Sequence, residues 1–180
     1  MEPTRYSVFY ERITGWIRRR QHGVFLLNLI NRILTCMMYI LYPLLLLRIL
    51  ISGIRSGQIP GNGLAEFLIY LLVPGISFVL LSMIRDQINW KRPYEEHRIQ
   101  PLISKNTTGH SMPSRHVFSC TIIAMCILTK SVPAGILLLC LSLILAVIRV
   151  LGGVHYPRDT IAGLFSGFAA GGILLVLLNF

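Results

Sequence analysis

Three short polar segments hold the residues of this chain that could carry out chemistry. The third reads "RVLGGVHYPRD" at residues 149–159, between two strongly apolar stretches. His155 and Asp159 stand four residues apart, so the carboxylate could accept a hydrogen bond from one imidazole nitrogen and leave the other free to react. The two glycines permit a sharp turn, and Pro157 suits the first turn of a helix. Taken alone, such a histidine could equally be a polar anchor near a membrane surface.

The second segment, "GHSMPSRHVFS" at residues 109–119, has the composition of a helix start. Pro113 and Ser114 stand just ahead of an apolar run, where helix caps occur. A helix N-terminus presents free backbone N–H groups and a favourable dipole to an anion. Arg115 and His116 would then lie at an anion-binding helix end, although a plain helix cap explains the segment equally well by itself.

The first segment contains Arg85 and Arg92, seven residues apart, followed by Pro93. Seven residues are about two helical turns, so on a continuing helix both guanidinium groups would share one face. Pro93 makes continuation of the helix up to Arg92 unfavourable. By themselves, these arginines would be explained as anchors at the end of a membrane helix.

Apolar helices must position these segments, because 54% of the 180 residues are hydrophobic and only 13% are charged. Several stretches approach or exceed the roughly 20 apolar residues that cross a bilayer. We therefore expect an all-α integral membrane bundle of about five transmembrane helices, forming a single domain over residues 1–180. The expected spans are residues 24–52, 64–84, 117–128, 134–148 and 160–180, of which the third is short.

Two further segments complete the expected organisation. Residues 1–22 mix aromatic side chains with arginines, a composition typical of an interfacial helix on an anionic membrane surface, or of a solvated basic tail. Residues 85–115 form the one long polar insertion, and long insertions of this kind are often functional or disordered. We interpret this insertion as an active-site loop.

Short turns between the spans would place all three segments at one end of the bundle. Arg85 and Arg149 end two helices there, while His116 and His155 stand where two others begin. Arginine forks suit phosphate oxygens, and two histidines suit a nucleophile paired with an acid. The chemistry that this gathering favours is phosphoryl transfer.

Together the segments resemble the three signatures of the type 2 phosphatidic acid phosphatase superfamily, which includes lipid phosphatases, glucose-6-phosphatase and vanadium haloperoxidases. Those signatures are K-x-x-x-x-x-x-R-P, P-S-G-H and S-R-x-x-x-x-x-H-x-x-x-D. This chain has "RDQINWKRP" at 85–93, "PSRH" at 113–116 and "IRVLGGVHYPRD" at 148–159. The resemblance covers about 75 residues, and the order of the helices around the motifs also agrees.

The resemblance implies a role for each site residue. His155 would attack phosphorus and form a phosphohistidine, with Asp159 orienting it. His116 would protonate the departing alkoxide and then activate the water that releases phosphate. The phosphoryl oxygens would be bound by Arg85, Arg92, Arg149 and Ser114. No cofactor is implied, and no metal-ligand set is visible, so the implied reaction is independent of metals.

Three positions depart from the signatures. Arg85 replaces a lysine, which keeps the charge but changes a point donor into a planar fork. Arg115 replaces a glycine, so a cation stands where the family has bare backbone; it could bind a second phosphate or narrow the site. Ile148 replaces a serine and removes a hydroxyl. Both histidines, the aspartate and three cations remain, so we expect activity.

The net charge of +10 indicates that the binding partners are anionic. Most positive charge stands at helix ends and in loops, and no nucleic-acid-binding motif is present, so we expect anionic lipids and no nucleic acid. Extra charge at Arg115, Lys91 and Lys105 mildly favours a doubly charged head group. The four cysteines lie in apolar runs without a C-x-x-C pair and indicate neither redox nor metal chemistry. Nothing indicates an oligomeric state.

The leading hypothesis is an integral membrane lipid phosphatase acting on phosphatidic acid, phosphatidylglycerol phosphate or a polyprenyl diphosphate. Two alternatives are an anion transporter, since charges inside membranes often mark ion paths, and a non-catalytic binder of anionic lipids. We expect a bacterial plasma membrane. The face of the active site stays open, because relatives face outward or towards a lumen whereas the positive-inside rule points to the cytoplasm.

Overall fold

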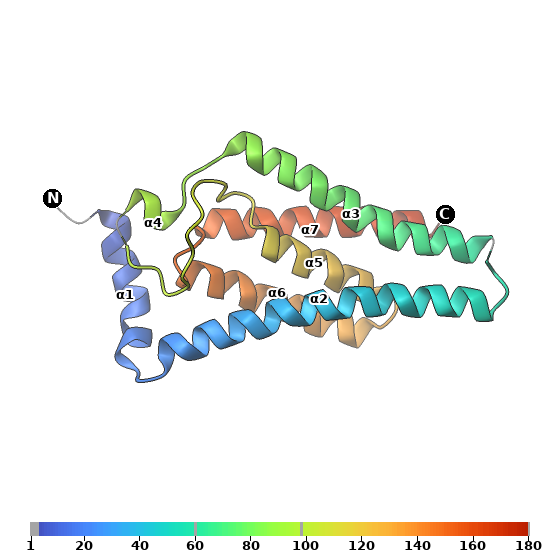
Figure 1. Cartoon of the computed structure of the whole chain (residues 1–180), viewed down its shortest axis with the longest axis horizontal. Coiled ribbons are helices and arrows are strands. Elements are labelled where there is room, and N and C mark those ends of the chain that lie inside the picture. The colour runs from blue at the N-terminus through green and yellow to red at the C-terminus, as the bar shows by residue number, and fades with distance from the viewer. Residues whose placement is uncertain (1–3, 60, 98, 180) are drawn as a thin grey trace.

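The chain folds into a bundle of α-helices, with one helix lying across its end (Figure 1). The computed structural model describes residues 4–59, 61–97 and 99–179, and every regular element in these residues is helical. The all-α prediction is therefore confirmed. The helices are α1 Arg5–Arg19, α2 Gly23–Arg55, α3 Asn62–Ile88, α4 Pro93–Glu96, α5 Arg115–Leu128, α6 Val132–Leu151 and α7 Pro157–Leu178.

Four of the described helices, α2, α3, α6 and α7, are long and apolar enough to cross a membrane. The fifth apolar helix, α5, has 14 residues and is about 21 Å long, less than the roughly 30 Å of a hydrocarbon core. Most of α5 is buried, because it packs against the other four in the middle of the bundle (Figure 1). The predicted integral membrane bundle of about five helices is confirmed, with α5 enclosed by its neighbours.

Glycines on one face of α7 bring it into close contact with α5. Gly163, Gly167 and Gly171 recur at four-residue intervals, as small residues do in closely packed membrane helices. A Cβ added at Gly163 would lie 2.7 Å from the Ser114 carbonyl oxygen, and one at Gly167 would lie 2.6 Å from the Cβ of Thr121. The two backbones are therefore nearly in contact, which brings the start of α5 against the start of α7.

Helix α1 lies across the end of the bundle at which α2 and α7 begin (Figure 1). Thr14 and Ile17 belong to its buried face, whereas Phe9 and Trp16 are exposed. Exposed aromatic side chains suit the interfacial position expected for residues 1–22, of which 1–3 lie outside the described residues. Contact between this helix and a membrane surface stays a prediction.

The polar insertion expected at residues 85–115 is shorter in the structure, because the flanking helices extend into it. Helix α3 continues to Ile88, and Asn89 ends it in the left-handed region with a φ of 42°. The chain therefore leaves the helical path before Arg92, as the following proline predicts. The remaining segment contains α4 and then runs without regular structure to the start of α5.

Candidate active site

His155 and Asp159 lie buried together where α6 meets α7. Their side chains are 1% and 0% exposed, and 3.6 Å separates His155 Nδ1 from Asp159 Oδ2. The same oxygen accepts hydrogen bonds from the backbone N–H of Tyr156, at 2.9 Å, and from the Ser111 hydroxyl. Asp159 is thus fixed by two donors while it faces Nδ1 of His155. The Nε2 atom of His155 has no hydrogen-bond partner among the described residues.

Contacts from α1 fix the turn that carries His155. Gly153 has a φ of 74°, and a Cβ there would lie 2.7 Å from the Tyr10 hydroxyl. That hydroxyl donates to the Leu151 carbonyl at 3.0 Å and accepts from the Leu102 N–H at 3.3 Å. Only glycine fits this conformation and this contact without strain. Tyr10 therefore joins α1, the polar loop and the end of α6 beside the candidate nucleophile.

Burial lowers the pKa of His155 below its ordinary value. The carboxylate of Asp159 opposes this shift, whereas the positive charges of Arg149 and Arg92 add to it. The imidazole is therefore neutral at pH 7. A neutral imidazole with one nitrogen facing a carboxylate has a free electron pair on the other, which is the state that a nucleophile needs.

Ser114 and His116 come from the start of α5. The backbone N–H of Ser114 donates to the Asp159 carbonyl oxygen at 2.9 Å, which joins the first turns of α5 and α7. The Ser114 side chain occupies the N-cap position without capping the helix, and its buried oxygen has no partner among the described residues. His116 is half-buried and lines a cavity of about 300 Å³. Ser114 thus retains a free hydroxyl for an anion.

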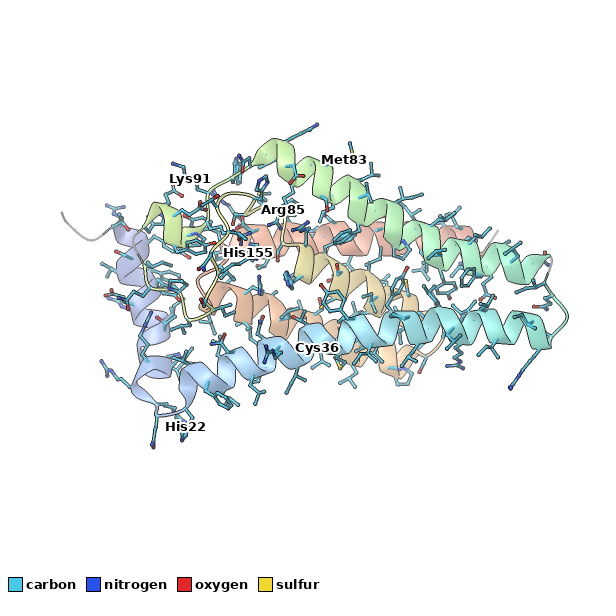
Figure 2. The ribbon with its side chains drawn as sticks, viewed as in Figure 1. His22, Cys36, Met83, Arg85, Lys91 and His155 are labelled. Carbon is cyan, nitrogen blue, oxygen red and sulfur yellow. The ribbon has the colours of Figure 1, made fainter. Side chains whose placement is uncertain are left out.

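Arg85 and Arg149 bring buried positive charge to the same end of the bundle. Each is 3% exposed, and Figure 2 shows Arg85 and His155 near the polar loop at this end of the bundle. Arg85 donates to the Pro113 carbonyl at 3.1 Å, and Arg149 donates to Asn31 Oδ1 at 3.3 Å. The Nε atoms of both, and one terminal nitrogen of Arg149, have no partner among the described residues. These free donors are available to phosphate oxygens.

Arg92 lies in the same cluster but already makes several contacts. Its guanidinium donates to the carbonyl oxygens of Gly109, Val154 and His110, at 3.0, 3.0 and 3.2 Å. Glu95 supports the arrangement by accepting from the backbone N–H groups of Arg92 and Gly109. Since a guanidinium has five N–H donors, two are left for an anion. Arg92 therefore braces the polar loop against the turn that carries His155.

Arg115 differs from the other arginines because its side chain is exposed. It lines the same cavity as His116, and its guanidinium carbon lies 6.0 Å from the centre of the Phe78 ring on α3. No carboxylate of the described residues lies within ion-pair distance of it. Arg115 therefore adds an unneutralised cation at the edge of the buried site.

Lys105, in the polar loop, is a further cation that the signatures do not include. Its side chain is half-buried. Burial lowers the pKa of Lys105 to about 7, with further lowering by Arg92, Arg149, Arg85 and Arg115. Lys105 thus lies within the electrostatic reach of the whole arginine cluster. An anion bound there would favour the protonated lysine.

The structure brings all the predicted site residues to one end of the bundle: His155, His116, Asp159, Arg85, Arg92, Ser114, Arg115 and Arg149. Sequence reasoning did not identify Ser111, Asn31 or Tyr10, and it treated Lys105 only as extra charge. Their contacts with the site depend on the path of the backbone, and no motif marks them. Within the described residues, no three His, Cys, Asp or Glu side chains cluster as metal ligands would.

Comparison with known proteins gives one family match and two similar solved structures. The profile of the PAP2 superfamily matches residues 66–180. The crystal structure of LpxE from Aquifex aeolicus is similar, with a TM-score of 0.69, 18% identity, and 98% of each chain covered. That of a PAP2-type phosphatidylglycerolphosphate phosphatase from Bacillus subtilis has a TM-score of 0.54 and 19% identity, with 94% of this chain and 92% of that chain covered.

A search of curated protein sequences found no match. The two structural similarities concern the fold, whereas the profile match spans well over half of the chain and includes all three signatures. The chain therefore belongs to the PAP2 superfamily.

Proposed function

We propose that this protein is an integral membrane phosphatase that removes phosphate from a membrane lipid through a phosphohistidine intermediate. The observation that carries the proposal is the geometry of His155: its side chain is buried, Nδ1 faces Asp159, and Nε2 is unpartnered among the described residues. Free N–H groups of Arg85 and Arg149, in the last turns of α3 and α6, lie at the same end of the bundle. This combination suits attack on a phosphoryl group whose oxygens are neutralised by cations.

In the first step, Nε2 of His155 forms a bond to phosphorus and the bond to the leaving oxygen breaks. His116 donates a proton to that oxygen, so the lipid departs as an alcohol. Asp159 stabilises the positive charge that develops on the His155 ring. Arg85, Arg149, Ser114 and the remaining donors of Arg92 bind the three phosphoryl oxygens.

In the second step, water attacks the phosphohistidine. His116, now neutral, takes a proton from this water as the new P–O bond forms. The P–N bond breaks, its electrons return to His155, and inorganic phosphate leaves. The proposal assigns no step to a metal ion or a cofactor.

A groove between α2 and α3 supports a lipid as the substrate. The cavity at His116 shares Met38, Tyr39 and Phe78 with a second, strongly apolar cavity of about 290 Å³ that reaches Pro43 and Pro74. Because they share these walls, the two cavities lie next to each other, the first at the polar site and the second in the apolar part of the bundle. Together they could hold a hydrocarbon chain while the phosphate lies against the arginines. Because both similar structures come from bacterial proteins, we propose a bacterial plasma membrane as the location.

The test is phosphate release by detergent-purified protein, with a chelator present. Phosphatidic acid, phosphatidylglycerol phosphate and a polyprenyl diphosphate would be compared. His155→Ala should lower turnover at least about a thousandfold, because the nucleophile is lost. His22→Ala is the matched control, since His22 is exposed between α1 and α2, away from the site (Figure 2). Lipid binding without release would instead indicate a non-catalytic binder, and equal release by the His155 variant would refute the mechanism.

A further inference from the structure

The proposed mechanism assigns no role to Arg115, although this residue lies at the site. It is the first residue of α5 and stands in the sequence between Ser114, whose hydroxyl has no partner among the described residues, and His116. It lines the cavity at His116, over the ring of Phe78. An exposed arginine without an acidic partner at the mouth of an apolar groove is a suitable ligand for an anionic group of a lipid.

Because His116 and Arg115 line the same cavity, the position of His116 indicates which part of the substrate Arg115 would contact. A general acid must lie beside the leaving oxygen, so the leaving group lies on the His116 side of phosphorus. The cavity there contains His116 and Arg115, whereas His155 is absent from its described lining. In the proposed mechanism, the transferred phosphoryl group lies against His155, Arg85 and Arg149 instead. Arg115 therefore faces the leaving group and the start of the hydrocarbon chain.

We propose, resting on the proposed phosphatase function, that Arg115 binds a second phosphate within the leaving group and thereby selects lipid diphosphates over lipid monophosphates. In a diphosphate, the phosphate next to the bridging oxygen lies between the transferred group and the hydrocarbon. Arg115 suits this position, because it lines the cavity that contains His116, Phe78 and Tyr39 and lies over the Phe78 ring.

The chemistry of the two substrate types differs at the leaving oxygen. When a lipid diphosphate reacts, the N–P bond to His155 forms, the bridging P–O bond breaks, and the electrons move onto the lipid monophosphate that departs. Arg115 neutralises this negative charge. When a lipid monophosphate reacts, the departing alkoxide is far more basic and needs the proton of His116. The diphosphate reaction should therefore depend more on Arg115 and less on His116.

The experiment compares kcat/KM for a polyprenyl diphosphate and for phosphatidic acid, with wild type, Arg115→Gln, Arg115→Lys and Arg48→Gln. Glutamine keeps a polar side chain but loses the charge, and lysine keeps the charge. Arg48 is an exposed arginine of α2 that lines a separate surface depression and serves as the control. Arg115→Gln should lower the ratio of diphosphate to monophosphate kcat/KM by about tenfold to a hundredfold. Arg115→Lys should recover most of that loss, and Arg48→Gln should leave the ratio unchanged.

Two results would overturn the proposal and leave the phosphatase function standing. One is a wild-type protein that hydrolyses phosphatidic acid but not the diphosphate. The other is an Arg115→Gln variant whose two kcat/KM values fall by the same factor. A wild-type protein that releases phosphate from none of phosphatidic acid, phosphatidylglycerol phosphate and the polyprenyl diphosphate would instead refute the phosphatase function, and the specificity proposal with it.

Discussion

Ser114 and Asp159 are joined through their backbones, because the Ser114 N–H donates to the Asp159 carbonyl oxygen at 2.9 Å. Ser114 is the N-cap of α5, and Asp159 lies in the first turn of α7. This bond connects the helix that carries His116 to the helix that begins just after His155. The relative position of the two histidines is therefore set by the packing of α5 on α7.

Gly163→Ala should disturb that packing. The added methyl group would lie 2.7 Å from the Ser114 carbonyl oxygen, a backbone atom that cannot turn aside. We expect a loss of about 1–3 kcal/mol in stability and a fall in kcat. Thermal unfolding in detergent and steady-state turnover would measure both effects. Gly172→Ala is the matched control, because nothing lies within 4 Å of its added Cβ, and alanine favours a helix. Equal behaviour of the two variants would contradict the role given to this contact.

His116→Ala should allow the phosphoenzyme to accumulate when the leaving group needs no proton. With p-nitrophenyl phosphate, attack by His155 can proceed, but the second step lacks its general base. We expect a burst of nitrophenol and acid-labile phosphate on the protein, measured by rapid quenching. Added His155→Ala should abolish both signals. Slow release without a burst, and without label on the protein, would argue against a covalent intermediate.

Ser111→Ala should lower kcat more than it changes KM. The Ser111 hydroxyl donates to the Asp159 oxygen that faces His155, so its loss leaves the carboxylate freer to move. A loss of about tenfold in kcat is expected from one hydrogen bond to a charged group. Ser166→Ala is a suitable control, because its hydroxyl donates only to the Ala162 carbonyl of its own helix. A change in KM alone would indicate that Ser111 acts on substrate binding instead.

Lys105 should make substrate binding weaken as the pH rises through about 7, where burial and the neighbouring arginines place its pKa. Below that pH the lysine is cationic and attracts the phosphate, and above it the lysine is neutral. We expect KM to rise about tenfold between pH 6 and 8. Lys105→Arg keeps its charge over this range and should flatten the profile, whereas Lys105→Met should give a high KM throughout. Because the substrate's own titration is common to all three proteins, identical profiles would exclude this role.

The apolar runs predicted the helices well because lipid and protein neighbours both require apolar side chains. For the same reason, the sequence could not distinguish α5, which is enclosed by protein, from the helices that face lipid. Nor did it reveal why Gly163, Gly167 and Gly171 stand on one face of α7, since the backbone that they approach comes from a different part of the chain.

The site was predictable where residue type and helix ends determine it, and less so where backbone atoms are the partners. His155 and Asp159 meet because they are four residues apart at a helix start. The sequence cannot predict which three backbone carbonyl groups accept from Arg92, because every residue has a carbonyl group. Likewise, the approach of Lys105 to the arginines depends on how the polar loop crosses the site.

The glycine face of α7 has a consequence for how the protein could admit a bulky lipid. Where α5 meets α7, the backbones are nearly in contact, so few side chains between them can rearrange. Between α2 and α3, in contrast, the walls of the groove include flexible or exposed side chains such as Met38, Tyr39 and Phe78. Rotation of these side chains can widen the groove while the two histidines keep their separation. The groove between α2 and α3 can thus adapt to lipid tails of different shapes, whereas the contact between α5 and α7 fixes the geometry around the phosphate.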